Sequence, residues 1–190
     1  SADGPLAMQM DPQSGLSAET VVNDFDERQL GEIIRTMGEE RAWRRIAHAV
    51  VRARSRSRIV RTGQLAGIIR SAVPGAHAIK SCARVFQSLR IFVNDELANL
   101  ELFLPQALAA LRPGGRFGVI SFHSLEDRIV KEFIREGADP CICPPKLPVC
   151  VCGAVPRLRP VGRLVVPTAA EVAANPSARS ARLRVAEKIV

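Results

Sequence analysis

The sequence predicts an α/β protein in which a helical module is followed by the closing half of a doubly wound domain. Residues 17–71 carry helical periodicity with no strand signal between successive helices. Residues 83–190 then read as helix, strand, helix, strand, strand, which is typical of α/β sheets. Within that part, the apolar run at residues 117–122 ends in a cluster of polar side chains. Ligands of open α/β sheets bind at such strand ends, so we expect a site there.

The helical module is predicted as four short helices. Ser17 is a favourable N-cap, Asp24 and Glu27 form a capping-box pattern, and Thr62 is the expected cap of the fourth helix. The third helix is expected over about residues 39–53, where apolar residues recur at helical spacing. Residues 1–16 lack this periodicity and read as an irregular connector.

The second half begins with a long helical pattern that ends at Leu111. Pro105 lies inside this pattern and is expected to kink or restart the helix. A Pro-Gly-Gly turn leads into the strand at residues 117–122, which is apolar on both faces, as a strand buried inside a sheet would be. A further helix over residues 129–134 follows. Two more strands are expected, at residues 163–166 and 182–189.

The charge balance favours a polyanionic partner. The formal net charge is +8 at pH 7 with a pI near 10.1, and arginine supplies nearly all of the positive charge. Arginine suits bidentate phosphate contacts, which favours nucleic acid, although a GC-rich genome also replaces lysine by arginine. No tyrosine and a single tryptophan argue against a single-strand binder built on aromatic stacking. No apolar run approaches the roughly eighteen residues that a membrane span needs.

Arginines are concentrated in the third predicted helix and the loop after it. Residues 41–61 contain eight of them, more than solubility requires. Helical spacing places several in one line on the face away from Trp43, which predicts contacts with RNA phosphates. The alternative is a solvated helix face whose charge Glu39 and Glu40 partly offset. The arginines in this region are Arg41, Arg44, Arg45, Arg52, Arg54, Arg56, Arg58 and Arg61.

The cysteine pattern indicates a candidate metal site. Two Cys-x-Cys pairs, Cys141 with Cys143 and Cys150 with Cys152, are separated by a proline-rich stretch. Residues i and i+2 of an extended chain point to the same side, so a turn between the pairs would gather four thiolates around a zinc ion. The alternative is a loop with unligated thiols. With Cys82 the count is odd, which suggests a reducing compartment.

Several strings spread along the whole chain give it a family resemblance. In the residues and the order of these strings, the chain resembles the RsmH/MraW family of S-adenosylmethionine-dependent methyltransferases. The string at residues 121–128 is the most specific of them. The strings are Asp3-Gly-Pro-Leu6, Met8-Gln-Met-Asp11, Gly38-Glu-Glu-Arg41, Phe86-Gln-Ser-Leu-Arg-Ile91, Val93-Asn-Asp-Glu-Leu97, Ser121-Phe-His-Ser-Leu-Glu-Asp-Arg128, Asn175-Pro176 and Ser180-Ala-Arg-Leu-Arg-Val-Ala-Glu187.

The resemblance implies the C-terminal half of a class I, Rossmann-like methyltransferase core with an inserted all-helical subdomain. Residues 1–13 would connect from an N-terminal core, 14–82 would be the inserted, RNA-contacting subdomain, and 83–190 would continue the core with a Cys/Pro-rich loop at 139–160. The implied reaction methylates the N4 amino group of a cytidine in small-subunit ribosomal RNA. The implied partner is the small ribosomal subunit, in the bacterial cytoplasm, or in an organellar matrix or stroma if the source is eukaryotic. Arg84 joins the expected RNA contacts.

The chain also departs from the family pattern. It has no glycine-rich loop after a strand, so S-adenosylmethionine contacts are expected upstream of Ser1 and the chain reads as a fragment. Ala7 and Gln9 stand where the family has an acid and an arginine, and residues 79–83 replace the usual Pro-Ala-Thr. The Asp/Asn-Pro-Pro-aromatic motif of amino-group methyltransferases is absent, so the N4 assignment follows from the resemblance alone.

Methyl transfer to an exocyclic amine needs in-line placement of the amine and an acceptor for its proton. The candidates to orient or deprotonate the amine are His123, Asp11, Glu126 and Asp127, of which His123 has the most suitable pKa. Alternatively, the polar residues of this loop cap and stabilise the next helix. Two other functions stay open: a non-catalytic RNA-binding module, and a zinc-dependent protein-interaction module. The sequence does not predict an oligomeric state.

Overall fold

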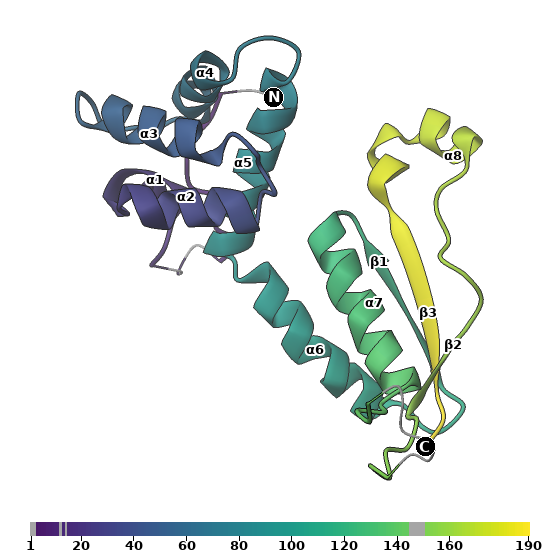
Figure 1. The fold of residues 1–190 in the computed structure, drawn as a ribbon. Coiled ribbons are helices and arrows are strands. Elements are labelled where there is room, and N and C mark those ends of the chain that lie inside the picture. Colours follow the sequence, from purple (N-terminus) through teal and green to yellow (C-terminus); the bar gives the residue numbers. More distant parts are fainter. Residues whose placement is uncertain (1–2, 12, 14, 145–150) are drawn as a thin grey trace. The chain divides into compact units, whose positions relative to one another are not determined.

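The computed structural model describes residues 3–11, 13, 15–144 and 151–190 of the 190-residue chain. It divides into two compact units, Ser1–Glu96 and Leu97–Val190, and each is described by itself. The described residues form a mixed α/β protein with many helices and a three-stranded sheet (Figure 1). The mixed α/β class predicted from the sequence is confirmed. No helix in the described ranges is long and apolar enough to cross a bilayer.

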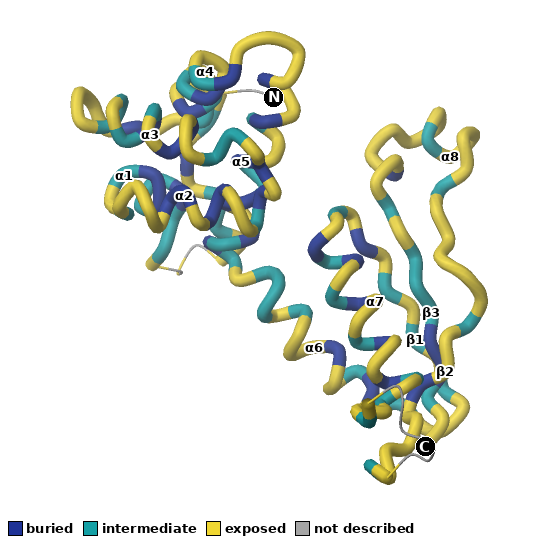
Figure 2. Tube along the Cα trace, in the orientation of Figure 1, coloured by how far each residue is buried: buried dark blue, intermediate teal, exposed yellow. Residues whose placement is uncertain are grey.

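The first unit consists of helices packed around one apolar core. Each helix contributes buried side chains to this core, for example Ile34, Ile46 and Leu89, all at most 1% exposed. Figure 2 shows buried and exposed positions alternating along these helices, as amphipathic sequences require. The helices are α1 (Ala18–Asp24), α2 (Glu27–Thr36), α3 (Trp43–Arg54), α4 (Thr62–Ala72) and α5 (Ala78–Val93).

The N-terminal segment of this unit is extended and packs against the start of α4. The Leu6 amide donates to the Val60 carbonyl at 3.0 Å, and the Thr62 amide donates to the Gly4 carbonyl at 2.9 Å. Leu6 is fully buried in the core. The segment read as a connector therefore also stabilises the helical unit.

The structure confirms one of the predicted helix caps and corrects another. Ser17 Oγ accepts a hydrogen bond from the Thr20 amide at 3.0 Å, as predicted for the first cap. The capping box of α2, however, is formed by Asp26 and Gln29, not by Asp24 and Glu27. Asp26 offers the same carboxylate cap two residues later, and its i+3 partner is a glutamine that bonds back to it.

The third and fourth helices also start differently from the prediction. α3 begins at Trp43 instead of Glu39, because Glu39 has a φ of 47°, outside the helical region. Thr62 is the first residue of α4 and not its cap. Its hydroxyl instead accepts from the Gly4 amide at 3.0 Å, which fixes the N-terminal segment.

The long helix predicted from residue 83 to Leu111 is two helices. α5 ends at Val93 and α6 (Glu96–Ala110) begins three residues later. Asp95 between them has a φ of 51°, which a helix does not accommodate. Pro105 lies inside α6 and does not end it, so the predicted restart at the proline is wrong. The break comes where Asp95 takes the left-handed conformation.

The second unit combines α6 and a further long helix with an antiparallel three-stranded sheet. Its other elements are β1 (Arg116–Ser121), α7 (Ser124–Ala138), β2 (Leu158–Pro160), α8 (Ala169–Ala174), η1 (Pro176–Ser180) and β3 (Arg182–Lys188). The strand order is β1-β3-β2, and β3 is antiparallel to both neighbours. β1 and β2 therefore run parallel to each other and are joined by α7, which is the crossover that a doubly wound sheet uses.

One face of this sheet carries the core of the second unit. Leu104 of α6 and Val130 of α7 pack with Phe117, Val119 and other residues on this face. On the opposite face of β1, Ile120 is 58% exposed, so the expected burial of both faces is not found in the described residues. The strand predicted at residues 163–166 is also wrong: Val165 forms only an isolated bridge with Leu183, and the third strand is β2. Gly162, with φ +71°, turns the chain between the two.

Candidate functional site

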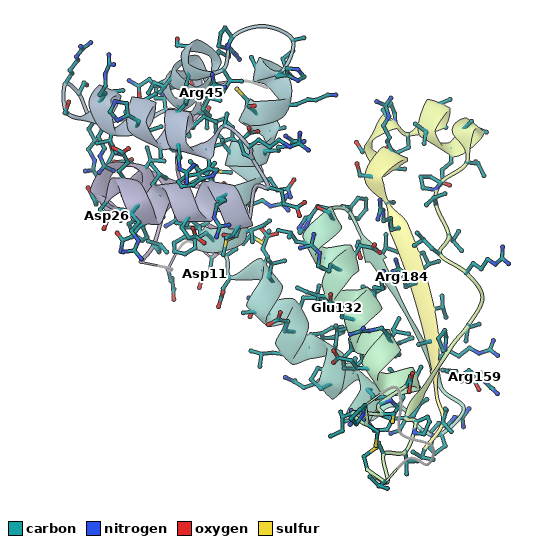
Figure 3. All side chains as sticks on the ribbon, in the orientation of Figure 1. Asp11, Asp26, Arg45, Glu132, Arg159 and Arg184 are labelled. Atoms are coloured by element: carbon teal, nitrogen blue, oxygen red, sulfur yellow. The ribbon has the colours of Figure 1, made fainter. Side chains whose placement is uncertain are left out.

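The first candidate site is the arginine face of α3 and the residues that flank it. The arginines predicted to contact RNA here are exposed, and within the described parts of the chain none has an acidic partner. Arg44 stacks over the Trp43 ring at 4.6 Å from its centroid. Arg45 extends from the same helix (Figure 3). The five arginines of this face are Arg41, Arg44, Arg45, Arg52 and Arg56.

The other arginines of this region have structural contacts. Arg54 donates to the Val22 carbonyl at 2.7 Å. Arg58 forms ion pairs with Glu19 at 2.9 Å and Asp24 at 3.0 Å, and Arg61 pairs with Asp3 at 2.6 Å. The eight arginines therefore divide into three that hold the helical unit together and five whose guanidinium groups are available to a ligand.

Two hollows lie along the five-arginine face. One of about 720 Å³ runs between α3 and α4 and is lined by Arg45, Arg52 and Arg56 among others. The second, of about 620 Å³, lies beside the start of α3 and is lined by Arg41, Arg44 and Arg45 together with cationic residues of α5. Basic walls around hollows of this size create a positive potential that attracts phosphates.

The α5 side of the second hollow contains residues that the sequence did not single out. His77 and Lys80 line it with Arg84, at i, i+3 and i+7 spacing, and this spacing is the signal that would have found them. Arg84 Nη1 lies 3.4 Å from Glu40 Oε2. Glu40 is only 4% exposed and also accepts from the Ala42 amide at 2.8 Å. Arg84, unlike the arginines of the five-arginine face, is thus held by a buried carboxylate.

The second candidate site is the turn between β1 and α7. His123 is the N-cap of α7, and its Nδ1 accepts a hydrogen bond from the Glu126 amide at 3.3 Å. The Glu126 carboxylate accepts in return from the amides of Phe122 at 2.8 Å and His123 at 3.2 Å. This reciprocal arrangement is a capping box, with histidine in the place of the usual serine or threonine.

The capping role decides which nitrogen of His123 carries the proton. Because Nδ1 accepts, a neutral ring has its proton on Nε2. Nε2 is buried, lies 3.3 Å from Glu126 Oε1, and has no partner with hydrogen-bond geometry in the described residues. Burial raises the pKa of Glu126, but the opposing hydrogen bonds from His123 and from the Phe122 backbone outweigh it and lower that pKa overall. Glu126 is therefore a carboxylate at neutral pH.

Asp127 is held in a different way. It is 7% exposed, and both of its oxygens accept from arginines of β3: Arg184 Nε at 2.7 Å and Arg182 Nη1 at 3.0 Å. The hydrogen bond from Arg184, with a smaller contribution from Arg182, lowers the pKa of Asp127 despite its burial. These contacts tie α7 to β3 at the strand end that carries the polar turn.

Asp11, Ser121 and Phe122 complete the list of residues to be placed. Asp11 belongs to the first unit and accepts from the Gln13 amide at 2.8 Å, whereas the other predicted catalytic residues belong to the second. Sequence reasoning missed Phe122, which is 54% exposed directly after β1, and Ser121, whose buried hydroxyl has no partner in the described ranges. An aromatic residue at the end of the predicted strand, directly before His123, is the sequence signal that would have found Phe122.

The cysteines of the Cys/Pro-rich loop come together. The sulfur atoms of Cys141, Cys143 and Cys152 all lie within 4.8 Å of one another. Cys150, the fourth predicted ligand, lies outside the described residues. Cys82 is on α5 in the first unit and is not part of this cluster.

Comparisons with known proteins cover almost the whole chain. The MraW methylase family matches residues 1–189. A protein of Geobacter sulfurreducens named ribosomal RNA small subunit methyltransferase H is 55% identical over 191 residues, which is 98% of this chain and 61% of the relative. Proteins of the same name from Heliobacterium modesticaldum and a Paenibacillus species are 50% and 46% identical, each over 98% of this chain. The chain thus spans about 61% of the length of such relatives.

Proposed function

Because the chain belongs to the MraW methylase family, we propose that this protein methylates the N4 amino group of a cytidine in small-subunit ribosomal RNA, with S-adenosylmethionine as the methyl donor. The proposal concerns the whole protein, since the chain spans about 61% of the relatives' length. Its partner is then the small ribosomal subunit or its RNA, in the bacterial cytoplasm. The names of the relatives support ribosomal RNA as the substrate class, and the N4 position comes from the family resemblance.

The parallel strands β1 and β2, joined by α7, support a Rossmann-like core for the second unit. In the described sheet β3 lies between β1 and β2 and runs antiparallel to both. The helical unit is then the inserted subdomain, with the region of residues 14–82 as its main part. In this arrangement the five-arginine face serves RNA binding, and the β1–α7 turn lies at the strand end where a ligand is expected.

The observation that carries the proposed RNA binding is the absence of acidic partners for the five-arginine face in the described residues. Arg58 and Arg61 show that acidic residues pair with arginines elsewhere in the same unit. Five exposed guanidinium groups on one face repel one another, and phosphates relieve that repulsion. Arg84, fixed by Glu40, supplies one pre-positioned cation beside them.

The β1–α7 turn is proposed to hold the target base. Because Nδ1 of His123 accepts the capping hydrogen bond, a neutral ring has Nε2–H as a donor and is not suited to removal of the amine proton; Nε2 is buried and would have to be reached by the base. Glu126, kept ionised by its hydrogen bonds, is the proposed acceptor toward the amine, with Asp11 as the other candidate. Phe122 offers an exposed ring for stacking the extruded base. Asp127 acts as a positioning residue, because both of its oxygens are occupied by arginines.

We propose that the contacts to S-adenosylmethionine lie outside the residues that the structure describes. No glycine-rich loop follows a strand, and the loop after β1 is occupied by the capping box of α7. We therefore assign no cofactor contact to these 190 residues, and the methyl group is supplied by the cofactor when the whole protein binds it. The chain alone is expected to bind RNA and to show little or no binding of S-adenosylmethionine by calorimetry. Tight cofactor binding by the chain alone would contradict this division of roles.

The test of RNA binding replaces Arg45, Arg52 and Arg56 by alanine and measures affinity for small-subunit ribosomal RNA as a function of salt. Each phosphate contact contributes about 0.7 to 0.9 to the slope of log K against log salt, so losing three contacts lowers the slope by about 2 to 2.7. The control removes the same charge elsewhere, at the exposed Arg35, Arg112 and Arg135. Equal slopes for the two triple variants would mean that net charge, and not this face, binds the RNA.

A further inference from the structure

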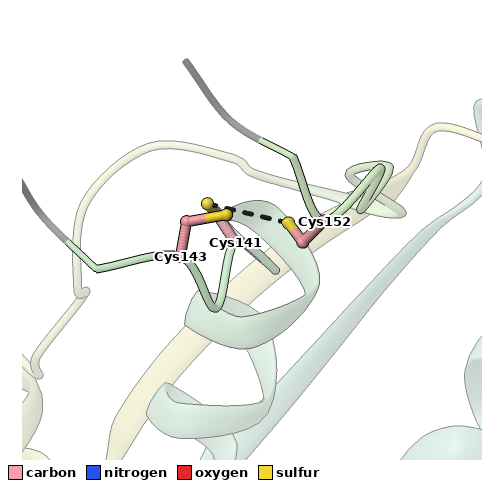
Figure 4. Close-up of side chains that lie close together, drawn as sticks. All are labelled: Cys141, Cys143 and Cys152. Carbon is pink, nitrogen blue, oxygen red and sulfur yellow. Dashed lines mark hydrogen bonds between the residues drawn. The ribbon is translucent and has the colours of Figure 1, made fainter. Parts of the chain in front are cut away.

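The cysteine cluster of the second unit is not used by the proposed methyl transfer or RNA binding. Cys141 and Cys143 follow the end of α7, and Cys152 precedes β2. The three side chains point toward one another (Figure 4). Between and beside them, Ile142 is 87% exposed and Val151 is 77% exposed. The three thiols therefore face one another while the large apolar side chains beside them face solvent, which hydrophobic burial alone does not explain.

The spacing of the sulfur atoms matches a metal site and not a disulfide. Cys141 Sγ and Cys152 Sγ are 3.8 Å apart, and all three sulfurs lie within 4.8 Å of one another. A disulfide needs about 2.05 Å between its sulfur atoms. Thiolates about 2.3 Å from a tetrahedral zinc ion are about 3.8 Å from each other. In the structure Cys152 Sγ donates a hydrogen bond to Cys141 Sγ at this separation, which is also the separation that two ligands of one zinc ion need.

The backbone on both sides of the cluster is held by the fold. The Arg157 amide donates to the Gly137 carbonyl at 2.8 Å, so the end of α7 and the start of β2 are adjacent. Leu158 is 1% exposed and packs directly on Gly137, where a Cβ atom would lie 2.6 Å from its Cδ1. Gly153 follows Cys152 with a φ of +62°, a left-handed turn that glycine adopts at low cost. The two chain segments that bear the thiols are thus anchored close to each other.

We propose that Cys141, Cys143 and Cys152 bind one Zn²⁺ ion as a structural site. Soft thiolate ligands in a tetrahedral arrangement favour zinc among the divalent ions available to proteins. Three described ligands leave one position of the tetrahedron for a further donor. The ion would link residues eleven apart in sequence and would fix the segment between α7 and β2. Zinc binds deprotonated thiolates, so the zinc affinity of such a site falls at low pH.

The first measurement is the zinc content of the whole protein, purified without a histidine tag and after exposure to zinc. About one zinc per chain is expected, because a structural site holds a single ion. Single serine variants at Cys141, Cys143 and Cys152 are each expected to lose zinc to a competing chelator about 100-fold more readily. Cys82→Ser is the matched control and keeps the wild-type zinc content, since Cys82 lies in the first unit. Equal zinc retention in all four variants would overturn the proposal.

A second measurement needs no variant and so does not depend on the variants folding. Alkylation of each cysteine in the wild-type protein is followed by mass spectrometry with and without added zinc. Zinc is expected to slow the alkylation of Cys141, Cys143 and Cys152 and to leave Cys82 unchanged. Unchanged alkylation of the three cysteines, or a Cys141–Cys152 disulfide in their place, would refute the metal site. Neither measurement depends on methyltransferase activity.

Discussion

Replacing Asp127 by asparagine tests whether its ion pairs hold α7 to β3. The substitution keeps the size of the side chain and removes its charge, which leaves Arg184 and Arg182 without a carboxylate. Asp127 is 7% exposed and Arg184 is 20% exposed, so this pair is largely shielded from water. Arg182 is 48% exposed and is expected to matter less.

The size of the effect follows from these exposures. Breaking a buried ion pair by removing one partner costs about 3 to 5 kcal/mol, and the partial exposure of both arginines places Asp127→Asn near the lower end, at about 3 kcal/mol. Arg182→Ala should cost about 1 kcal/mol or less, as exposed pairs do. Arg184→Ala should lie between the two. The predicted order of the three variants is as informative as the magnitudes.

Hydrogen exchange of the β1–β3 backbone amides is the assay, because the single tryptophan, Trp43, is in the other unit and does not report on this sheet. The slowest amides of β3 should exchange faster in Asp127→Asn by the factor that corresponds to about 3 kcal/mol, roughly 150-fold. Unchanged protection, or a larger effect from Arg182→Ala than from Arg184→Ala, would refute the assigned role of this pair.

The same pair predicts a pH dependence. The native pKa of Asp127 lies below the unfolded value of about 3.9, so its contribution to stability is fully present above about pH 4. The contribution is lost as the pH falls through the lowered native pKa. The difference in protection between wild type and Asp127→Asn should therefore shrink in acid. A difference that stays constant down to about pH 2 would mean that packing, not charge, is responsible.

The remaining predictions concern the polar turn and the helical unit. His123→Asn keeps a good N-cap and removes the ring, whereas His123→Ala removes both, at a cost of about 1 kcal/mol in stability. If Nε2 orients the base, both variants lose turnover in the whole enzyme. Normal turnover in His123→Asn would mean that the histidine acts only as a helix cap. Gly38→Ala should lower the unfolding free energy by about 1 to 3 kcal/mol, because its Cβ would lie 2.6 Å and 3.0 Å from two backbone carbonyl oxygens. Gly67, an exposed position of α4, has open space around it, so Gly67→Ala should raise the unfolding free energy by up to about 1 kcal/mol. Tryptophan fluorescence in urea measures both changes.

Together, the five-arginine face and the turn after β1 divide the proposed reaction between the two units. In this proposal the first unit would supply cations for the RNA backbone, and the second would supply a donor, a carboxylate and an exposed ring at a strand end. The structural zinc proposed at Cys141, Cys143 and Cys152 would stabilise the second unit away from its polar turn. These roles are separable by experiment, since each has its own variants and its own readout.

The helices were largely predictable because their signals are local. Apolar spacing located α1 to α4, and Ser17 was identified as a cap from its side chain alone. The errors come from competing local signals of similar strength. Asp24 and Asp26 have the same capping chemistry, and Pro105 looked more disruptive than Asp95, whose left-handed φ actually separates α5 from α6.

The sequence alone determined which residues could form the sites: the arginines between residues 41 and 61, the spaced cysteines and the polar string after β1. The sequence alone also indicated the family. Their roles depend on contacts between residues far apart in the chain. Asp127 meets arginines 55 and 57 residues later, and Arg61 meets Asp3 58 residues earlier. Only the tertiary structure therefore shows which arginines pair with acidic residues in the described part of the chain, and that Cys152 lies beside Cys141. Periodicity and capping act within a few residues, whereas an ion pair forms only where folding brings its two charges together.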